Sequence, residues 1–315
     1  MTKESFRIKS HSLHKLFIVS PYVIILVIKE LYSHIVSPNP LIPISLIFIG
    51  ELFIFVGYTE AGIIVHGLNL IFTILCVALY EDRAYLALIL IPLFRLLNIS
   101  MPVFFSLTLY TFALIYAPML IPINLVWRSG KFSNVELGLK GKNQSFYLPV
   151  AVGLGLILGW IEYSILHPEV LVPDLSLVNI ITLSIIMIFF VGFIEEFVFR
   201  STLQTVLEER LGTITGLVIA SLVFGIMHSG YRLPQEILFV SFGGLVFGIL
   251  FKKSRSLAVA SLAHGVTNIS LFLISPIDPL LIVPLVLLAG FFAFLSAFVS
   301  NENRRIDMIN RFIKK

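Results

Sequence analysis

Long apolar runs, separated by short polar stretches, make up most of this chain. The strongest runs are about 20 residues long, which is the length that a helix needs to cross the hydrocarbon core of a bilayer. They lack the alternation of apolar and polar residues that marks a membrane strand, so they predict helices and exclude a β-barrel. In the C-terminal half the predicted spans are residues 147–167, 177–206, 214–231, 235–251, 257–275 and 280–300.

The N-terminal half is less regular. Its apolar runs are residues 16–36, 41–58, 62–80, 84–98 and 102–127. The run at 84–98 is the weakest, because it is short and contains Pro92 and Arg95. We expect it to be re-entrant or interfacial, which leaves four crossings and returns the chain to the side on which it began.

These runs predict an all-α polytopic membrane protein, with a six-helix bundle preceded by about four additional N-terminal transmembrane helices. The polar stretch from Arg128 to Ser145 separates the two parts. The predicted domains are therefore residues 1–134, residues 135–300 and a basic tail at 301–315. Two glycine pairs, Gly155 with Gly159 and Gly244 with Gly248, have the small-xxx-small spacing that allows close helix packing.

Composition agrees with this fold class. The chain is 58% hydrophobic and 13% charged, whereas soluble domains contain about 25% charged residues. The basic residues gather near the N-terminus, in the 128–142 stretch, at Lys252–Arg255 and near the C-terminus. The positive-inside rule places all four clusters, and hence both termini, in the cytoplasm. No other basic face exists, so we expect the bilayer rather than nucleic acid as a partner.

Three short polar clusters interrupt the apolar spans. They are Glu195 and Glu196 with Arg200, Phe224 with His228, and His264 with Asn268. Ionisable side chains inside a membrane are unfavourable unless they pair, line a wet cavity or perform chemistry. The clusters therefore predict one buried catalytic site that draws on three helices.

Helical spacing predicts different environments for the two glutamates. Glu196 and Arg200 are four residues apart and share a face, which predicts an ion pair, while Glu195 points about 100° away from Glu196. A salt bridge at a helix end on the membrane surface remains the alternative. The Glu pair is also expected toward the cytoplasmic side, whereas His228 is expected nearer the outer face if its helix is straight.

Hydrolysis is the chemistry that suits these residues. A carboxylate and a neutral histidine can deprotonate a water between them, and a second histidine with an asparagine amide can donate hydrogen bonds to an oxyanion. The chain has no H-E-x-x-H zinc motif, no G-x-S-x-G elbow and no aspartate within a span. A zinc site built from Glu195, His228 and His264 stays open as an alternative.

The ordered motifs E-E-x-x-x-R, F-x-x-x-H and H-x-x-x-N resemble those of the CPBP family. That family contains type II CAAX prenyl endopeptidases and bacteriocin-processing or bacteriocin-immunity membrane proteins. The resemblance covers about residues 135–275. It implies an intramembrane glutamic protease without an obligatory metal or other cofactor. By the same resemblance, Glu195 and His228 activate water, His264 and Asn268 form the oxyanion hole, and Glu196 and Arg200 order the site.

The expected function is therefore an intramembrane endopeptidase acting on a membrane-bound peptide or a lipidated, for example prenylated, protein. Two other classes stay open. One is a non-catalytic membrane protein of the same fold, acting in bacteriocin immunity or as a partner-binding scaffold. The other is a proton-coupled carrier that uses Glu195 and Glu196.

Overall fold

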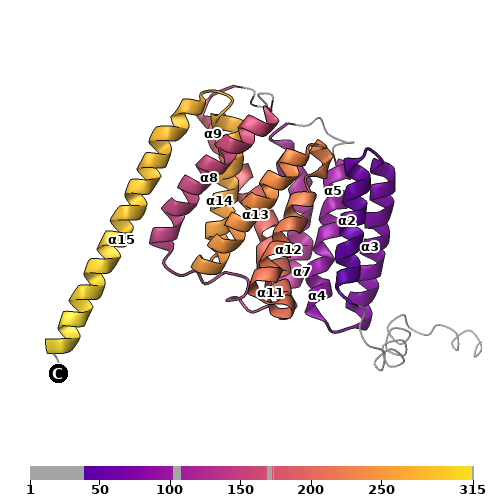
Figure 1. Cartoon of the computed structure of the whole chain (residues 1–315), viewed down its shortest axis with the longest axis horizontal. Coiled ribbons are helices and arrows are strands. Elements are labelled where there is room, and N and C mark those ends of the chain that lie inside the picture. The colour runs from indigo at the N-terminus through magenta and orange to yellow at the C-terminus, as the bar shows by residue number, and fades with distance from the viewer. Residues whose placement is uncertain (1–38, 102–107, 169–171, 173, 314–315) are drawn as a thin grey trace, which may run out of the picture.

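A computed structural model describes residues 39–101, 108–168, 172 and 174–313. Every regular element in these ranges is a helix (Figure 1). The predicted span at 16–36 and the basic N-terminal cluster lie outside the described residues. The N-terminal elements are α2 (Leu41–Phe55), α3 (Thr59–Leu79), α4 (Arg83–Leu88), α5 (Leu90–Ser100), α6 (Thr111–Tyr116), η2 (Ala117–Met119) and α7 (Leu120–Arg128).

The C-terminal part begins after the predicted polar linker. Its first elements are α8 (Gln144–Leu166), α9 (Leu177–Ile185), η3 (Ile186–Gly192), α10 (Phe193–Glu196), η4 (Phe197–Gln204) and α11 (Thr205–Leu211). They are followed by α12 (Thr213–Ile226), η5 (Ser229–Tyr231), α13 (Pro234–Ser254), α14 (Leu257–Ile269), η6 (Ser270–Ile274), η7 (Pro279–Leu281) and α15 (Ile282–Ile313).

The outside of the molecule suits a bilayer. Within the described ranges, nine helical segments are long and apolar enough to cross a membrane. Large apolar side chains on them face outward, such as Leu68, Leu238 and Leu287, which are 60%, 71% and 69% exposed. Exposing so much apolar surface to water is unfavourable, whereas lipid tails accommodate it. The protein is an all-α, multi-pass integral membrane protein, as the sequence predicts.

The segment around Arg95 differs from the expectation. Arg83–Ser100 is an 18-residue helical segment that is long and apolar enough to span a membrane, whereas we expected a short re-entrant or interfacial run. Arg95 is compatible with a span because it is 8% exposed and pairs with Glu51 inside the protein. Pro92 lies in the first turn of α5, where a helix does not need the missing N–H.

One 35-residue helical segment, Leu177–Leu211, carries the glutamate pair near its middle. π-helical turns, η3 and η4, lie on either side of α10. Such turns are frequent at functional sites. The prediction ended this helix near residue 206, but its polar end continues because Glu208 pairs with Lys252 and Glu209 with Arg83.

Two glycine pairs permit close helix contacts. A Cβ added at Gly159 on α8 would lie 2.6 Å from the Cβ of Ser270, and Gly155 is similarly crowded by α14. A Cβ added at Gly244 on α13 would lie 3.0 Å from the ring of Phe224. The predicted packing role of these pairs is confirmed.

The N-terminal helices pack directly on the C-terminal bundle. α2 contacts α12 and η5, α4 contacts η4 and α11, and α6 contacts η3. The C-terminal bundle is therefore packed against N-terminal helices that are far from it in the sequence.

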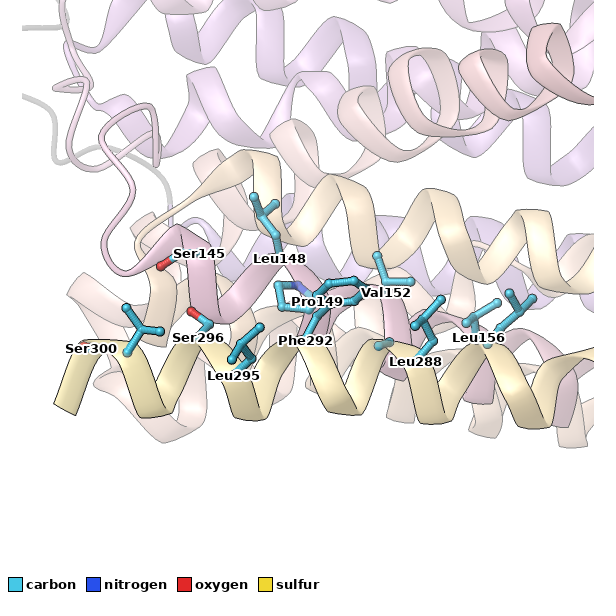
Figure 2. A pocket seen from close by; sticks show the side chains of 13 residues that line it. Ser145, Leu148, Pro149, Val152, Leu156, Leu288, Phe292, Leu295, Ser296 and Ser300 are labelled. Carbon is cyan, nitrogen blue, oxygen red and sulfur yellow. The ribbon is translucent and has the colours of Figure 1, made fainter. Parts of the chain in front are cut away.

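A groove of about 1040 Å³ separates α15 from α8. Figure 2 shows apolar side chains such as Leu148, Val152 and Phe292 along it, with Ser145, Ser296 and Ser300 toward one end. None of its described lining residues is ionisable. The groove therefore suits an acyl chain of the bilayer and offers no groups for hydrolysis.

Candidate active site

The three polar motifs meet at a different cavity, of about 470 Å³. Glu195 comes from α10, His228 follows the end of α12, and His264 and Asn268 come from α14. All four side chains line the cavity. Its size lies within the range of about 300–1,000 Å³ that is usual for ligand pockets. The structure therefore brings together the four residues that the sequence predicts to be catalytic.

The expected difference in depth between Glu195 and His228 does not occur. Glu195 lies inside a 35-residue helical segment rather than at the end of an 18-residue apolar run. α12 ends at Ile226, and His228 stands in the turn before η5. Both side chains reach the same cavity because the long helix continues to Leu211, which places Glu195 and His228 at similar distances along the chain from the turn at Gly212.

Glu196 and Arg200 form the predicted ion pair. The Nε atom of Arg200 lies 3.0 Å from Oε2 of Glu196, and both side chains are fully buried. The alternative of a salt bridge on the membrane surface is therefore wrong. Oε1 of Glu196 lies 2.9 Å from Nδ1 of His264, so the pair also holds this histidine.

Aromatic rings enclose these charged groups. The guanidinium of Arg200 stands over the ring of Phe224, 4.7 Å from its centroid. Phe247 stacks on His264 at 5.1 Å between ring centroids. Phe224 also makes an edge contact with His264, at 5.6 Å. The rings fix the orientation of His264 and screen the cluster from lipid.

The contacts of the two histidines define where their hydrogens lie. A carboxylate oxygen can only accept, so Nδ1 of His264 donates to Glu196. Nδ1 of His228 lies 3.2 Å from the carbonyl oxygen of Phe224, which can also only accept. In both rings Nε2 is therefore the nitrogen left for chemistry, and that of His264 lies 3.9 Å from Oε2 of Glu195.

The N-terminal half supplies part of the site, which sequence reasoning missed. The hydroxyl of Tyr116 donates to Oε1 of Glu195. Other N-terminal side chains that line the cavity are Phe94, Arg95, Asn98, Phe112 and Ile115. Tyr116 had no motif to reveal it, since aromatic residues are common in spans. The one signal was Arg95, an ionisable residue inside an apolar run.

A second polar cluster adjoins the cavity. Nη2 of Arg95 donates to Oε2 of Glu51 at 2.7 Å and to Oγ of Ser229 at 3.0 Å. Ser229 in turn donates to Oε2 of Glu51 at 2.5 Å. Nε2 of His66 lies 3.1 Å from Oε1 of Glu51. The hydroxyl of Ser229 is therefore hydrogen-bonded to Arg95 and Glu51, and it does not form a Ser–His dyad with its neighbour His228.

The proposed zinc set does not form a compact group. In the part of the chain that the structure describes, no group of three or more His, Cys, Asp or Glu residues is arranged to hold a metal ion. Glu195, His228 and His264 line one cavity, in which Nε2 of His264 lies 3.9 Å from Oε2 of Glu195. No chemical step below uses a metal.

Comparison with known proteins supports the motif assignment. Residues 177–270 match the family model described as Rce1-like, type II CAAX prenyl endopeptidase Rce1-like. The matched segment covers less than a third of the chain, and it contains all three motifs. No curated protein and no solved structure matches. Residues 177–270 therefore resemble the Rce1-like family, and this match supports the resemblance to CPBP intramembrane proteases.

Proposed function

We propose that this protein is an intramembrane endopeptidase that hydrolyses a peptide bond in a prenylated, membrane-associated substrate. The Rce1-like match indicates a CAAX-type endopeptidase at the level of the family. The assignment of individual residues is our own proposal. Glu195 and His228 activate the water, and His264 and Asn268 stabilise the oxyanion.

The observation that carries this proposal is the burial of Glu195 beside a paired Glu196, Arg200 and His264. In the proposed mechanism, His264 donates through Nδ1 to Glu196 and offers Nε2–H to the cavity.

Water activation then uses the other half of the site. Tyr116 occupies Oε1 of Glu195, which leaves Oε2 to accept a proton. A water between Oε2 of Glu195 and Nε2 of His228 donates one hydrogen to each acceptor. As its oxygen attacks the substrate carbonyl, Glu195 takes the proton.

The oxyanion forms on the opposite side of the carbonyl. Nε2–H of His264 and the side-chain amide of Asn268 donate hydrogen bonds to it, because both groups line the cavity. When the intermediate collapses, the C–N bond breaks and Glu195 returns its proton to the leaving amine. The products are a carboxylic acid and an amine, which become a carboxylate and an ammonium when the acid's proton passes to the amine, and the enzyme is regenerated.

Product analysis tests this function directly. Purified protein in detergent is incubated with a farnesylated CAAX peptide and with its unprenylated counterpart, with and without a chelator, and the products are identified by mass spectrometry. We expect hydrolysis of the bond after the prenylated cysteine, faster than in the unprenylated peptide and unaffected by chelation. Intact peptide would refute the endopeptidase assignment, and loss of cleavage on chelation would refute the metal-free mechanism.

We also propose that both termini and the 128–142 linker face the cytoplasm, which the basic residues of the linker support. Cys76 is the only cysteine and is 2% exposed. Labelling by a thiol reagent therefore reports on a cysteine that is introduced at the surface. Lys140→Cys should react with an impermeant maleimide in inverted vesicles and not in right-side-out ones. The reverse pattern would contradict the topology.

A further inference from the structure

Arg95 is a basic side chain in the wall of the catalytic cavity that none of the steps above uses. It is 8% exposed, and α5 holds it where the N-terminal helices meet the cavity. Two of its hydrogen bonds, both from Nη2, go to Glu51 and Ser229. These bonds hold one edge of the guanidinium against the protein.

The rest of the guanidinium has unused donors. An arginine offers five N–H groups. Nε of Arg95 has no hydrogen-bond partner among the described residues, and neither does Oδ1 of the neighbouring cavity residue Asn98. The hydrogen bonds to Glu51 and Ser229 both come from Nη2, so Nη1 takes part in neither. A buried donor without a partner is costly, so this edge of Arg95 suits an acceptor that enters with the substrate.

A carboxylate suits the remaining donors best, because a guanidinium forms short, charge-assisted hydrogen bonds with it. The CAAX sequence stands at the C-terminus of its protein, so such a substrate carries a free carboxylate three residues beyond the prenylated cysteine. We propose that Arg95 binds this C-terminal carboxylate and thereby selects chain ends. The inference rests on the proposed endopeptidase function.

Two features of the surroundings support this role. Ser229, which holds Arg95, directly follows His228 in the chain, so the arginine is tied to the turn that carries a proposed catalytic residue. His66 lies 3.1 Å from Glu51. Glu51 therefore has a contact other than Arg95, so the remaining donors of Arg95 are not needed to hold it.

A purely structural ion pair between α2 and α5 is the competing explanation, and a matched pair of peptides separates the two. The peptides share one farnesylated sequence and differ only at the end, which is a free acid or an amide. We expect the parent protein to prefer the acid by about 10–100-fold in kcat/KM, as for a lost hydrogen bond to a charged group. The difference should lie mainly in KM.

Arg95→Gln should reduce this acid-to-amide ratio to near one while the amide is still cleaved. Because the variant leaves Glu51 buried without its partner, Glu51→Gln combined with Arg95→Gln is measured beside it. A structural role would lower both rates together and keep the ratio. The proposal would be overturned if the parent protein cleaved the acid and the amide equally well. It would also be overturned if both variants kept the acid-to-amide ratio of the parent.

Direct binding keeps this test independent of catalysis. The dissociation constants of both peptides, labelled at the N-terminus, are measured on the same proteins by fluorescence anisotropy. If the parent cleaves neither peptide, the proposed function fails, but the acid-to-amide ratio of the dissociation constants still decides the role of Arg95. Binding of neither peptide would overturn the role of Arg95 as well.

Discussion

Tyr116 shows how one hydrogen bond can assign different roles to the two oxygens of a carboxylate. Its hydroxyl donates to Oε1 of Glu195, which directs the remaining oxygen toward the cavity. Tyr116→Phe removes this donor and keeps the ring. We expect kcat for the farnesylated peptide to fall by about 10–100-fold, since a hydrogen bond to a charged group is lost.

The control for this variant is Tyr110→Phe, which removes the hydroxyl that donates to Asn179. Tyr110 does not line the catalytic cavity, so its variant should retain the parent rate within about twofold, as expected for a change away from the reacting groups. Equal rates for the two variants would show that the Tyr116 contact does not support catalysis.

At the residue scale, the sequence predicts what lies within one helical turn. The spacing of Glu196 and Arg200 predicts their ion pair, and the structure confirms it. The partner of Glu195 could not be predicted, because Tyr116 is 79 positions away in the chain and carries no motif. In the sequence, Arg95 only weakened the prediction of a membrane span at residues 84–98. Its ionisable side chain was in fact the signal for a second polar cluster.

At the scale of elements, the crossing of α8 and α14 depends on missing side chains. A Cβ at Gly159 would clash with the carbonyl oxygen of Thr267 on α14, so Gly159→Ala must push the two helices apart. We expect the variant to lose about 1–3 kcal/mol of unfolding free energy, the usual effect of overpacking. Thermal unfolding in detergent measures the change.

Gly243→Ala provides the matched control, because nothing lies within 4 Å of a Cβ added at Gly243 on α13. Alanine has the higher helix propensity, so this variant should be neutral or more stable by up to about 1 kcal/mol. Similar losses in the two glycine variants would mean that helix propensity, rather than close packing, governs this crossing.

The apolar runs predict which helices exist better than where they end. Sequence reasoning ended the long helix near residue 206, at the charged residues that follow, but the helix continues to Leu211. The next span, predicted at residues 214–231, agrees with the helical segment Thr213–Tyr231, within which the regular α-helix ends at Ile226. Hydrophobicity alone does not reveal partners such as Arg83 and Lys252, which allow a charged segment to remain helical.

On the scale of the whole molecule, Arg83 joins distant parts of the chain. It bonds Glu136 in the linker at 2.8 Å and Glu209 at the end of the long helix at 2.6 Å. Partial burial acts to raise the pKa of Glu136, but hydrogen bonds from Ser133 and Arg83 outweigh it and lower the pKa to about 2.

This lowered pKa makes the contact sensitive to acid. The ionised carboxylate stabilises the fold fully above its ordinary pKa of 4.5, and the contribution is lost as the pH falls toward about 2. The Tm difference between the parent and Glu136→Gln should therefore be largest near neutral pH and shrink below about pH 4. Glu60→Gln, at an exposed position, is the control. A difference that does not change with pH would contradict this role of Glu136.

The measurement that tests the central claim most directly compares hydrolysis of the farnesylated peptide by the parent, Glu195→Gln and Glu60→Gln. Removing a general base lowers rates by about 10²–10⁴-fold. We predict a loss of this size for Glu195→Gln, with thermal unfolding like that of the parent, and an unchanged rate for Glu60→Gln. Parent-like hydrolysis by Glu195→Gln would contradict the assignment of this buried glutamate as the base.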